Sequence, residues 1–409
     1  MAILVVTSEL DIHRTLESVR TLNVQLDDFI VLIEDLDQLN LNLPSTYFVN
    51  DFADHANVNS VLRKIGQEHL IKTVISSDEF SVHVAARARE IYGIPGMNCD
   101  VARRYRDKLV MKKIAEHNNI AVSQSFAISD LKENTVDFPL IIKPRSLAGA
   151  VGVLVIQSFS DIPERCTFEN SMFVDMDPSQ YIIEQYNPNK IVHVDIIVSR
   201  KNIIFITASM YEGTPLAYLR GEPLASISIE KEHINTIWLQ FAQKLNIAFQ
   251  FPDGVLHIEA FANETTEPQL LEIGYRPGGG PVVNVLNIAY GINLRTIHLA
   301  AQLGHFEKLT ALQTETTATH AWLIYPKNHT SDHPQYIDTI QAPSTNSLST
   351  LKSMSLPIIG QKASGEFYSH QDCLGSFIFI GTREDVISDI KKIRQQYKVI
   401  VRSEKNKSY

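Results

Sequence analysis

The sequence predicts a protein of mixed α/β and α+β class, in which a small doubly wound domain precedes a larger lobe of mixed strands and helices. Two observations carry this prediction. Continuous apolar runs alternate with helically spaced segments over residues 1–96, and short β-rich runs separated by turn residues follow from residue 138. With 409 residues the chain is longer than one typical domain, so we expect two or three domains with separate cores.

The N-terminal domain, residues 1–96, is predicted from three apolar runs that match buried parallel strands. These runs are residues 2–7, 29–33 and 73–76, and each is followed by a segment with helical spacing. Residues 81–92 repeat apolar side chains at helical intervals before Gly93, a residue typical of helix ends. No GxGxxG motif follows the first strand, so the dinucleotide-binding fingerprint is absent.

The middle of the chain predicts a helical region followed by a series of strands. Residues 97–118 have helical spacing and end near Asn118 and Asn119. The β-rich runs that follow are residues 138–143, 153–157, 181–184, 192–198 and 203–208. Two further predicted strands, residues 254–261 and 269–274, are joined by a polar turn at residues 262–268, which suits a hairpin.

The last hundred or so residues carry weaker signals until the very end. Residues 342–355 contain little periodicity, and we interpret them as a long loop or a boundary. Residues 375–381 then predict a strand, and residues 383–397 predict a helix that begins with Thr382 and an acidic first turn. The polar residues 401–409 are expected to be frayed.

Composition and charge exclude several classes of protein. The formal charge of -9 argues against a general nucleic-acid-binding protein, which needs a broad basic surface. Cys99, Cys166 and Cys373 have no spacing typical of a zinc site or a disulfide framework. The first residues resemble a buried strand more than a signal peptide, and no apolar run is long enough to span a membrane. We therefore expect a cytoplasmic protein; the oligomeric state stays open, with a homodimer as one option.

Lys143 is the first candidate for binding an anion. It ends an apolar strand, where an ammonium group needs a nearby negative charge. The loop after it contains Ser146, Gly149 and Gly152, small residues that let backbone N–H groups approach phosphate oxygens. The alternative is a glycine-containing turn with a lysine that reaches solvent.

Glu259 and Glu272 are candidates for holding a metal ion. Each is flanked by apolar residues on a strand of the predicted hairpin, so their pairing would place two carboxylates side by side. Two desolvated carboxylates repel each other, and a divalent cation resolves that conflict. Oxygen ligands favour Mg²⁺, with Mn²⁺ as a second option. The alternative is a pair of edge-strand glutamates that face solvent.

Arg276 follows the second glutamate and precedes a run of glycines, Gly278 to Gly280. Its planar guanidinium can bind a carboxylate or phosphoryl oxygen through two hydrogen bonds, and the glycines let a substrate lie against backbone. We expect Gly278 and Gly279 to contact substrate. His257 and Arg220 are weaker candidates for substrate contact, because a packed strand histidine and a solvated loop arginine are common.

Taken in order over residues 97–300, these motifs resemble the ATP-grasp superfamily, and within it the L-amino acid ligase (dipeptide synthetase) branch. The resemblance implies an ATP-grasp domain at residues 97–310, with a lid subdomain at about residues 120–186. It also implies that the domain of residues 1–96 precedes this fold and that an α+β region, residues 311–409, completes it.

The resemblance assigns roles to individual residues. Lys108, in an Asp-Lys pair, and Lys143 match the lysines that bind ATP phosphates, under the loop with Ser146 and Gly149. Glu184, Gln185 and Tyr186 match the hinge that pairs with adenine, mostly through backbone. Glu259 and Glu272 match the two metal ligands, and Arg276 matches the arginine that binds the reactant.

The activity implied is that of an ADP-forming carbon–nitrogen ligase. ATP and Mg²⁺ would activate a carboxylate as an acyl phosphate, and an amine would displace phosphate to form an amide or peptide bond. The two substrates are expected to be amino acids. The sequence has no serine or cysteine nucleophile motif, which agrees with phosphoryl transfer by charge neutralisation and positioning. The alternatives are an ATP-grasp carboxylase, a purine-pathway ligase or a non-catalytic ATP-binding protein.

Two positions depart from the pattern of the superfamily. Many members carry an asparagine two residues after the second metal-binding glutamate, where this chain has Gly274. The acidic residue that often binds ribose is replaced by Ile191, with Asp195 nearby. Metal binding is therefore expected to rest on the two glutamates, and the ribose contact is not assigned.

Overall fold

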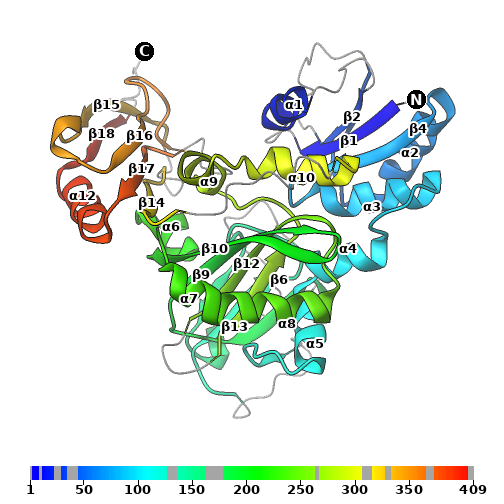
Figure 1. Cartoon of the computed structure of the whole chain (residues 1–409), viewed down its shortest axis with the longest axis horizontal. Helices are drawn as coiled ribbons and strands as arrows, with labels where there is room; N and C mark the ends of the chain where they lie inside the picture. Colours follow the sequence, from blue (N-terminus) through cyan, green and yellow to red (C-terminus); the bar gives the residue numbers. More distant parts are fainter. Residues whose placement is uncertain are drawn as a thin grey trace.

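The computed structural model describes residues 2–8, 12–22, 29–34, 45–126, 136–161, 178–262, 267–305, 316–327, 333–364 and 373–403, which form four β-sheets and the helices around them (Figure 1). Some predicted features lie outside these residues. They are Cys166, residues 263–266 of the hairpin turn, residues 127–135 and 162–177 of the lid, and residues 404–409 of the frayed end.

The first sheet is parallel and has helices on both faces. Its strands, in the order β3-β2-β1-β4, are β1 (Ala2–Ser8), β2 (Phe29–Glu34), β3 (Thr46–Val49) and β4 (Ile71–Ser76). The helices between them are α1 (Ile12–Arg20), α2 (His55–Glu68) and α3 (Ser81–Tyr92). Successive side chains of β1 enter different cores: Leu4 packs toward α2 and α3, and Val5 toward α1. The predicted doubly wound arrangement is confirmed.

The predicted helical region at residues 97–118 is two helices, α4 (Cys99–Arg106) and α5 (Lys108–His117). The chain is extended at Asp107, where the backbone has φ -95° and ψ 104°. The side chain of Asp107 accepts hydrogen bonds from the backbone N–H groups of Leu109 and Val110, which caps α5. The break matters because it places Lys108 in the first turn of a new helix.

Two antiparallel sheets form the larger lobe. The smaller has the order β5-β8-β6-β7, with strands β5 (Ser125–Phe126), β6 (Leu140–Pro144), β7 (Leu154–Ile156) and β8 (Tyr181–Gln185). The larger has the order β13-β12-β9-β10-β11-β14-β17-β16. Its strands from the predicted lobe are β9 (Ile191–Ser199), β10 (Asn202–Glu212), β11 (Leu224–Ser228), β12 (Gly254–Phe261) and β13 (Gln269–Gly274). All predicted strands of this region are confirmed.

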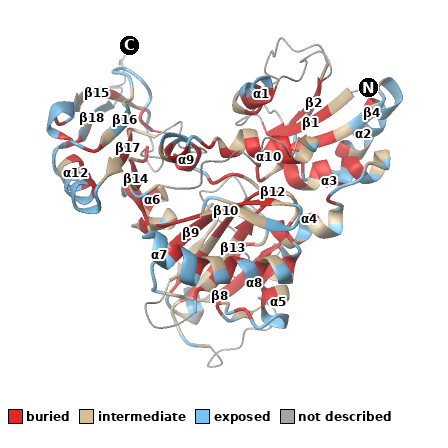
Figure 2. Cartoon of the chain, viewed as in Figure 1, coloured by how far each residue is buried: buried red, intermediate tan, exposed pale blue. Residues whose placement is uncertain are grey.

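Helices cover both faces of the eight-stranded sheet. A continuous helical segment packs on one face; it comprises α7 (Lys231–His233), the π-helical turn Ile234–Trp238 and α8 (Leu239–Phe249). The other face is covered in part by α6 (Pro215–Leu219), α9 (Val282–Tyr290) and α10 (Leu294–Leu303). β9 and β12 are buried along most of their length, as Figure 2 shows. The central strands are therefore packed on both faces, and the side chains of the second face lie between the sheet and these helices.

The C-terminal residues extend the same sheet. Strands β14 (Thr319–Ile324), β16 (Leu351–Ser355) and β17 (Ser376–Gly381) join it, and α12 (Arg383–Gln396) packs against β14 and β17. Thr382 caps α12 by accepting a hydrogen bond from Asp385 N, as predicted. β15 (Gln335–Gln341) and β18 (Lys398–Ser403) form a separate pair.

Two predictions for this region are wrong. The loop predicted at residues 342–355 ends in strand β16, and the fraying predicted from residue 401 begins too early, because residues 401–403 pair within β18. Both strands are largely exposed: β16 is mostly polar, and the short apolar run of β18, residues 399–401, does not alternate with polar residues, so neither has the pattern of a half-buried strand. No helix in the described part of the chain has the length and apolar character needed to cross a membrane.

Candidate active site

A cavity of about 920 Å³ opens where the three larger sheets approach one another. Its lining includes the β4–α3 connection, strands β6 to β8 and the second face of the eight-stranded sheet. The predicted site residues that line it are Lys108, Lys143, Gly149, Glu184, Gln185, Tyr186, Arg220, His257, Glu259, Glu272, Arg276, Gly278 and Gly279. Ser146 does not line this cavity; it is exposed, and its carbonyl oxygen accepts a hydrogen bond from Arg106.

The two glutamates face each other across the predicted hairpin. Glu259 on β12 is the register partner of Glu272 on β13, which confirms the predicted pairing. The hydroxyl of Tyr211 donates to Glu259 Oε1 over 2.9 Å, and Lys108 Nζ lies 2.8 Å from Glu272 Oε1. Both carboxylates line the cavity, so the alternative in which they face bulk solvent does not hold.

A buried carboxylate holds two lysines at the side of the cavity formed by β6 and β8. Glu184 Oε2 lies 2.8 Å from Lys143 Nζ, and its other oxygen lies 3.5 Å from Lys112 Nζ. Burial opposes ionisation of Glu184, but the two ammonium charges outweigh it and lower the pKa of the carboxyl. The negative charge beside Lys143 is therefore that of Glu184.

Lys112 was missed by the sequence analysis. It is fully buried, and its Nζ donates to the carbonyl oxygen of Leu270 over 2.7 Å. Burial lowers its pKa from 10.5 to about 8, although Glu184 acts in the opposite direction. The available signal was its spacing, because Lys112 is four residues after Lys108 and so lies on the same face of α5.

The predicted adenine hinge has its backbone donors engaged. Gln185 N donates to Gln124 O over 2.9 Å, and Tyr186 N donates to Pro139 O over 3.2 Å. Adenine pairing at this segment would therefore use carbonyl oxygens or a neighbouring N–H group. Gln185 and Tyr186 also line the cavity.

Glu79 is a second residue that the sequence analysis missed. It lies in the connection between β4 and α3, and its carboxylate accepts hydrogen bonds from Arg106 and from Arg276 Nε. Burial opposes ionisation, but the charges of the two arginines outweigh it and lower the pKa of Glu79 from 4.5 to about 2. The N-terminal sheet thus holds Arg276 in place. The available signal was an acidic residue after a parallel strand, where ligand-binding groups gather in open α/β sheets.

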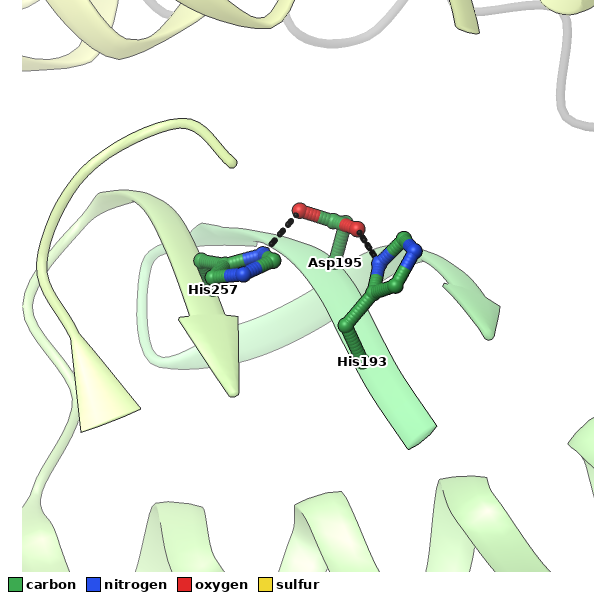
Figure 3. Close-up of side chains that lie close together, drawn as sticks. All are labelled: His193, Asp195 and His257. Carbon is green, nitrogen blue, oxygen red and sulfur yellow. Dashed lines mark hydrogen bonds and ion pairs between the residues drawn. The ribbon is translucent and has the colours of Figure 1, made fainter. Parts of the chain in front are cut away.

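Three buried polar side chains, His193 and Asp195 on β9 and His257 on β12, lie close together (Figure 3). Asp195 accepts hydrogen bonds of 2.8 Å from Nδ1 of His193 and from Nδ1 of His257. Burial lowers the pKa of His257, but the charge of Asp195 outweighs it, so the pKa rises from 6.5 to about 9. His257 Nε2 lies 3.8 Å from Glu259 Oε1. The cluster therefore supports the wall of the cavity beside Glu259.

The same three residues have the composition of a metal site, since their ligand atoms all lie within 4.8 Å of one another. However, both Nδ1 atoms already face the Asp195 carboxylate at hydrogen-bonding distance. Mg²⁺ also prefers oxygen ligands to imidazole nitrogen. We therefore interpret the cluster as a hydrogen-bonded network. Asp195 is fully buried and does not line the cavity, so it is not placed to bind ribose.

Gly278 packs directly against this network. A Cβ atom at Gly278 would lie 2.8 Å from Asp195 Oδ1 and 2.9 Å from His257 Nδ1. Any larger residue would push the two side chains apart or displace the loop. Glycine is therefore required at residue 278 by close packing. Gly279 has open space around its Cβ position and is not restricted in this way.

Comparison with known proteins identifies the fold. No family model matches the sequence. The structure resembles the L-amino acid ligase of Bacillus licheniformis, with a TM-score of 0.73, 15% identity and 98% of each chain covered. It also resembles phosphoribosylglycinamide synthetase of Anaerococcus prevotii, with a TM-score of 0.65, 13% identity, and 98% of this chain and 100% of that chain covered. The chain has the ATP-grasp fold.

A curated relative is similar at the level of sequence as well. The L-arginine-specific L-amino acid ligase of Bacillus subtilis is 22% identical over 254 residues, which is 61% of this chain. The match spans 62% of the length of that relative. The ATP-grasp fold predicted from the order of the motifs is therefore confirmed.

Within the ATP-grasp fold, the structure explains the unusual Gly274. A Cβ atom at this position would lie 3.0 Å from Glu79 Oε2. The space beside the end of β13 is thus occupied by the carboxylate of Glu79 from the β4–α3 connection, and a side chain at residue 274 would have to displace it. Glu79 and Gly274 form one arrangement, in which the missing asparagine makes room for the group that holds Arg276.

Proposed function

We propose that this ATP-grasp chain is a carboxylate–amine ligase that forms an amide or peptide bond through an acyl phosphate and releases ADP and phosphate. The observation that carries the proposal is the pairing of Glu259 with Glu272 in a cavity that also contains Lys108, Lys143 and Arg276. Opposed carboxylates suit a divalent cation, and the three cationic side chains suit phosphate and carboxylate groups. A cavity that contains both the carboxylate pair and the cationic side chains is suited to a reaction between a phosphate group and a carboxylate.

Glu259 and Glu272 would hold Mg²⁺, or Mn²⁺, because the two side chains offer oxygen donors on one wall of the cavity. When bound, such an ion would offset the charge of the ATP phosphates. Lys108 lies 2.8 Å from Glu272, so it can contact a phosphate oxygen next to that ion. Lys143 would exchange part of its contact with Glu184 for a phosphate oxygen.

Arg276 would bind the substrate carboxylate in line with the terminal phosphorus of ATP. A carboxylate oxygen then forms a bond to that phosphorus, and the bond to the ADP oxygen breaks. In the second step the nitrogen of a neutral amine bonds to the acyl carbon, the acyl–oxygen bond breaks and phosphate leaves, while the nitrogen loses a proton. The protein supplies orientation and charge, and none of its side chains forms a covalent intermediate.

Amino acids are the proposed substrates for both roles. Support comes from the two L-amino acid ligases that this chain resembles, one in structure and one in sequence. The relative from Bacillus subtilis is described as arginine-specific, so arginine belongs in any substrate screen. Synthetases of nucleotide precursors have a similar fold, and their substrate classes provide the main alternatives.

The test is ATP turnover by the full-length protein with Mg²⁺ and pairs of amino acids, followed by mass measurement of the product. We expect ADP and phosphate release that requires both a carboxylate and an amine, together with a product lighter than the two substrates by one water. Release that requires bicarbonate would identify a carboxylase instead. ATP binding without release for any pair would favour the non-catalytic alternative.

A further inference from the structure

The cavity continues past the metal-binding pair on the side away from the predicted nucleotide site. The four-stranded sheet that carries Lys143 and Glu184 is connected to the β13 edge of the eight-stranded sheet, because Val122, just before β5, pairs with Leu270 on β13. Across that sheet from β13, the order is β12, β9, β10, β11 and β14. Lining residues on β10, β11 and β14 therefore lie beyond Glu259 as seen from the nucleotide.

This far end of the cavity has apolar walls. Six buried residues line it, and we call them the apolar subsite: Tyr211, Tyr218, Leu224, Val283, Trp322 and Ile324. All six belong to one hydrophobic cluster, and they come from β10, α6, β11, α9 and β14. The rings of Tyr211 and Trp322 meet edge to face with centroids 6.0 Å apart, and Leu224 is the register partner of Ile324. The walls are thus held by packing on several elements.

The apolar subsite is continuous with the reacting centre. Tyr211 belongs to both, because its ring forms part of the subsite wall and its hydroxyl donates to Glu259 Oε1. A ligand whose carboxylate reaches Arg276 near the metal-binding pair can place a side chain between these walls. Charged residues at this end, Arg220 and Glu222, are exposed and lie on the loop between α6 and β11.

We propose that the apolar subsite binds the side chain of the carboxylate substrate, and that this substrate is an amino acid with a large aromatic or branched aliphatic side chain. The proposal rests on the proposed ligase function and adds the substrate class. A charged side chain would lose its hydration against these walls without a buried partner, which is costly. A large apolar side chain is stabilised by leaving water.

The experiment compares carboxylate substrates with the amine substrate held constant. Phenylalanine, leucine and methionine are compared with alanine, arginine and glutamate, using ADP release by the full-length protein. Val283→Phe adds bulk to the apolar subsite, and Val283→Ala enlarges it. Ile288→Phe is the matched control, because Ile288 is on the same helix, is exposed and does not line the cavity.

We expect kcat/KM to be highest for large apolar substrates, and Val283→Phe to lower it for these by roughly ten- to a hundredfold while alanine changes little. Val283→Ala should shift preference toward the largest side chains, and Ile288→Phe should change nothing. A preference for arginine or glutamate, or an equal loss for all substrates in Val283→Phe, would overturn the assignment.

The proposed function can fail separately. If no pair of amino acids releases ADP, calorimetry with a non-hydrolysable ATP analogue and Mg²⁺ still tests the apolar subsite. Tighter binding of phenylalanine than of arginine, weakened by Val283→Phe but not by Ile288→Phe, supports the subsite without ligation. Equal or absent binding of both amino acids contradicts it.

Discussion

The β12–β13 hairpin and the β4–α3 connection both place carboxylates in the same cavity, but they do so over very different distances along the chain. Glu259 and Glu272 are brought together by the register of one hairpin. Glu79 meets Arg276 across 197 residues, through the packing of the N-terminal sheet against the larger lobe. The comparison shows that one site can combine two carboxylates paired within a single hairpin with a third carboxylate that reaches the site only through the packing of distant segments.

The two places also differ in charge balance. On the hairpin, two carboxylates oppose each other and the nearest ammonium, Lys108, contacts one of them. At the connection, the carboxylate of Glu79 lies between the guanidinium groups of Arg106 and Arg276, so its negative charge is fully compensated. The hairpin is therefore suited to bind an added cation, whereas Glu79 is suited to hold Arg276 in place. Substitutions of the paired glutamates on the hairpin should therefore lower turnover, whereas substitutions at the connection should lower stability.

Glu272→Gln should have the largest effect, because the amide keeps the volume of the side chain but loses the charge that holds the metal. Turnover is expected to fall roughly a hundred- to a thousandfold with the fold intact, and Glu259→Gln should act in the same direction with a smaller loss. ADP release and circular dichroism measure the two properties. Glu267→Gln on the same hairpin, whose side chain is 64% exposed, should behave like wild type. Near-normal turnover in a folded Glu272→Gln protein would falsify the metal assignment.

Glu79→Gln should instead affect stability, because removing the carboxylate charge leaves the buried guanidinium of Arg106 and the partly buried guanidinium of Arg276 without a full counter-charge. The expected loss is on the order of 3 kcal/mol in the free energy of unfolding. The pKa of Glu79 is lowered from 4.5 to about 2 in the folded protein, so its stabilisation is complete above pH 4.5 and declines as the pH falls toward 2. Urea unfolding should therefore show a gap between wild type and variant that narrows with acidification.

The control for this prediction is Glu116→Gln, which removes an exposed carboxylate from α5. It should leave the unfolding curve unchanged at every pH. If Glu79→Gln were equally harmless, Arg276 would not depend on the N-terminal sheet, and the contrast between the two places would disappear.

Lys143→Met should weaken ATP binding by about 1.5 to 3 kcal/mol, the contribution of a charge-assisted hydrogen bond to phosphate. Lys112→Met makes the comparison sharper: Lys112 does not line the cavity, so its loss should lower stability more than ATP affinity. Calorimetry and urea unfolding distinguish the two outcomes, and Lys113→Met on the exposed face of α5 is the control. Unchanged ATP affinity in Lys143→Met would mean that this lysine serves only to balance Glu184.

Arg276→Lys should have the smallest effect on the fold, because the charge that pairs with Glu79 is kept. The planar pair of donors is lost, so carboxylate-dependent ADP formation should fall about tenfold while ATP affinity changes less. Initial rates at varied carboxylate and calorimetry with ATP measure the two effects. A variant that turned over normally, or that failed chiefly in ATP binding, would require Arg276 to be reassigned to the nucleotide.

Patterns within short stretches of the chain were enough to predict most of the framework. The apolar run of β1, the helix that ends at Gly93 and the hairpin of Glu259 and Glu272 each depend on neighbouring residues, so periodicity and turn chemistry reveal them. The order of the motifs was enough to indicate the ATP-grasp fold. Strands β16 and β18 were missed because they lie exposed and show no apolar alternation.

Contacts between distant segments determined the rest. Glu79 is one acidic residue in a short polar connection, and nothing in its neighbourhood indicates that it meets Arg106 and Arg276. The burial of Lys112 and the requirement for glycine at residue 278 likewise arise from side chains that other strands bring within a few ångströms. The chain specifies its strands and helices through local physical chemistry, whereas charge compensation in a buried site depends on which segments pack together.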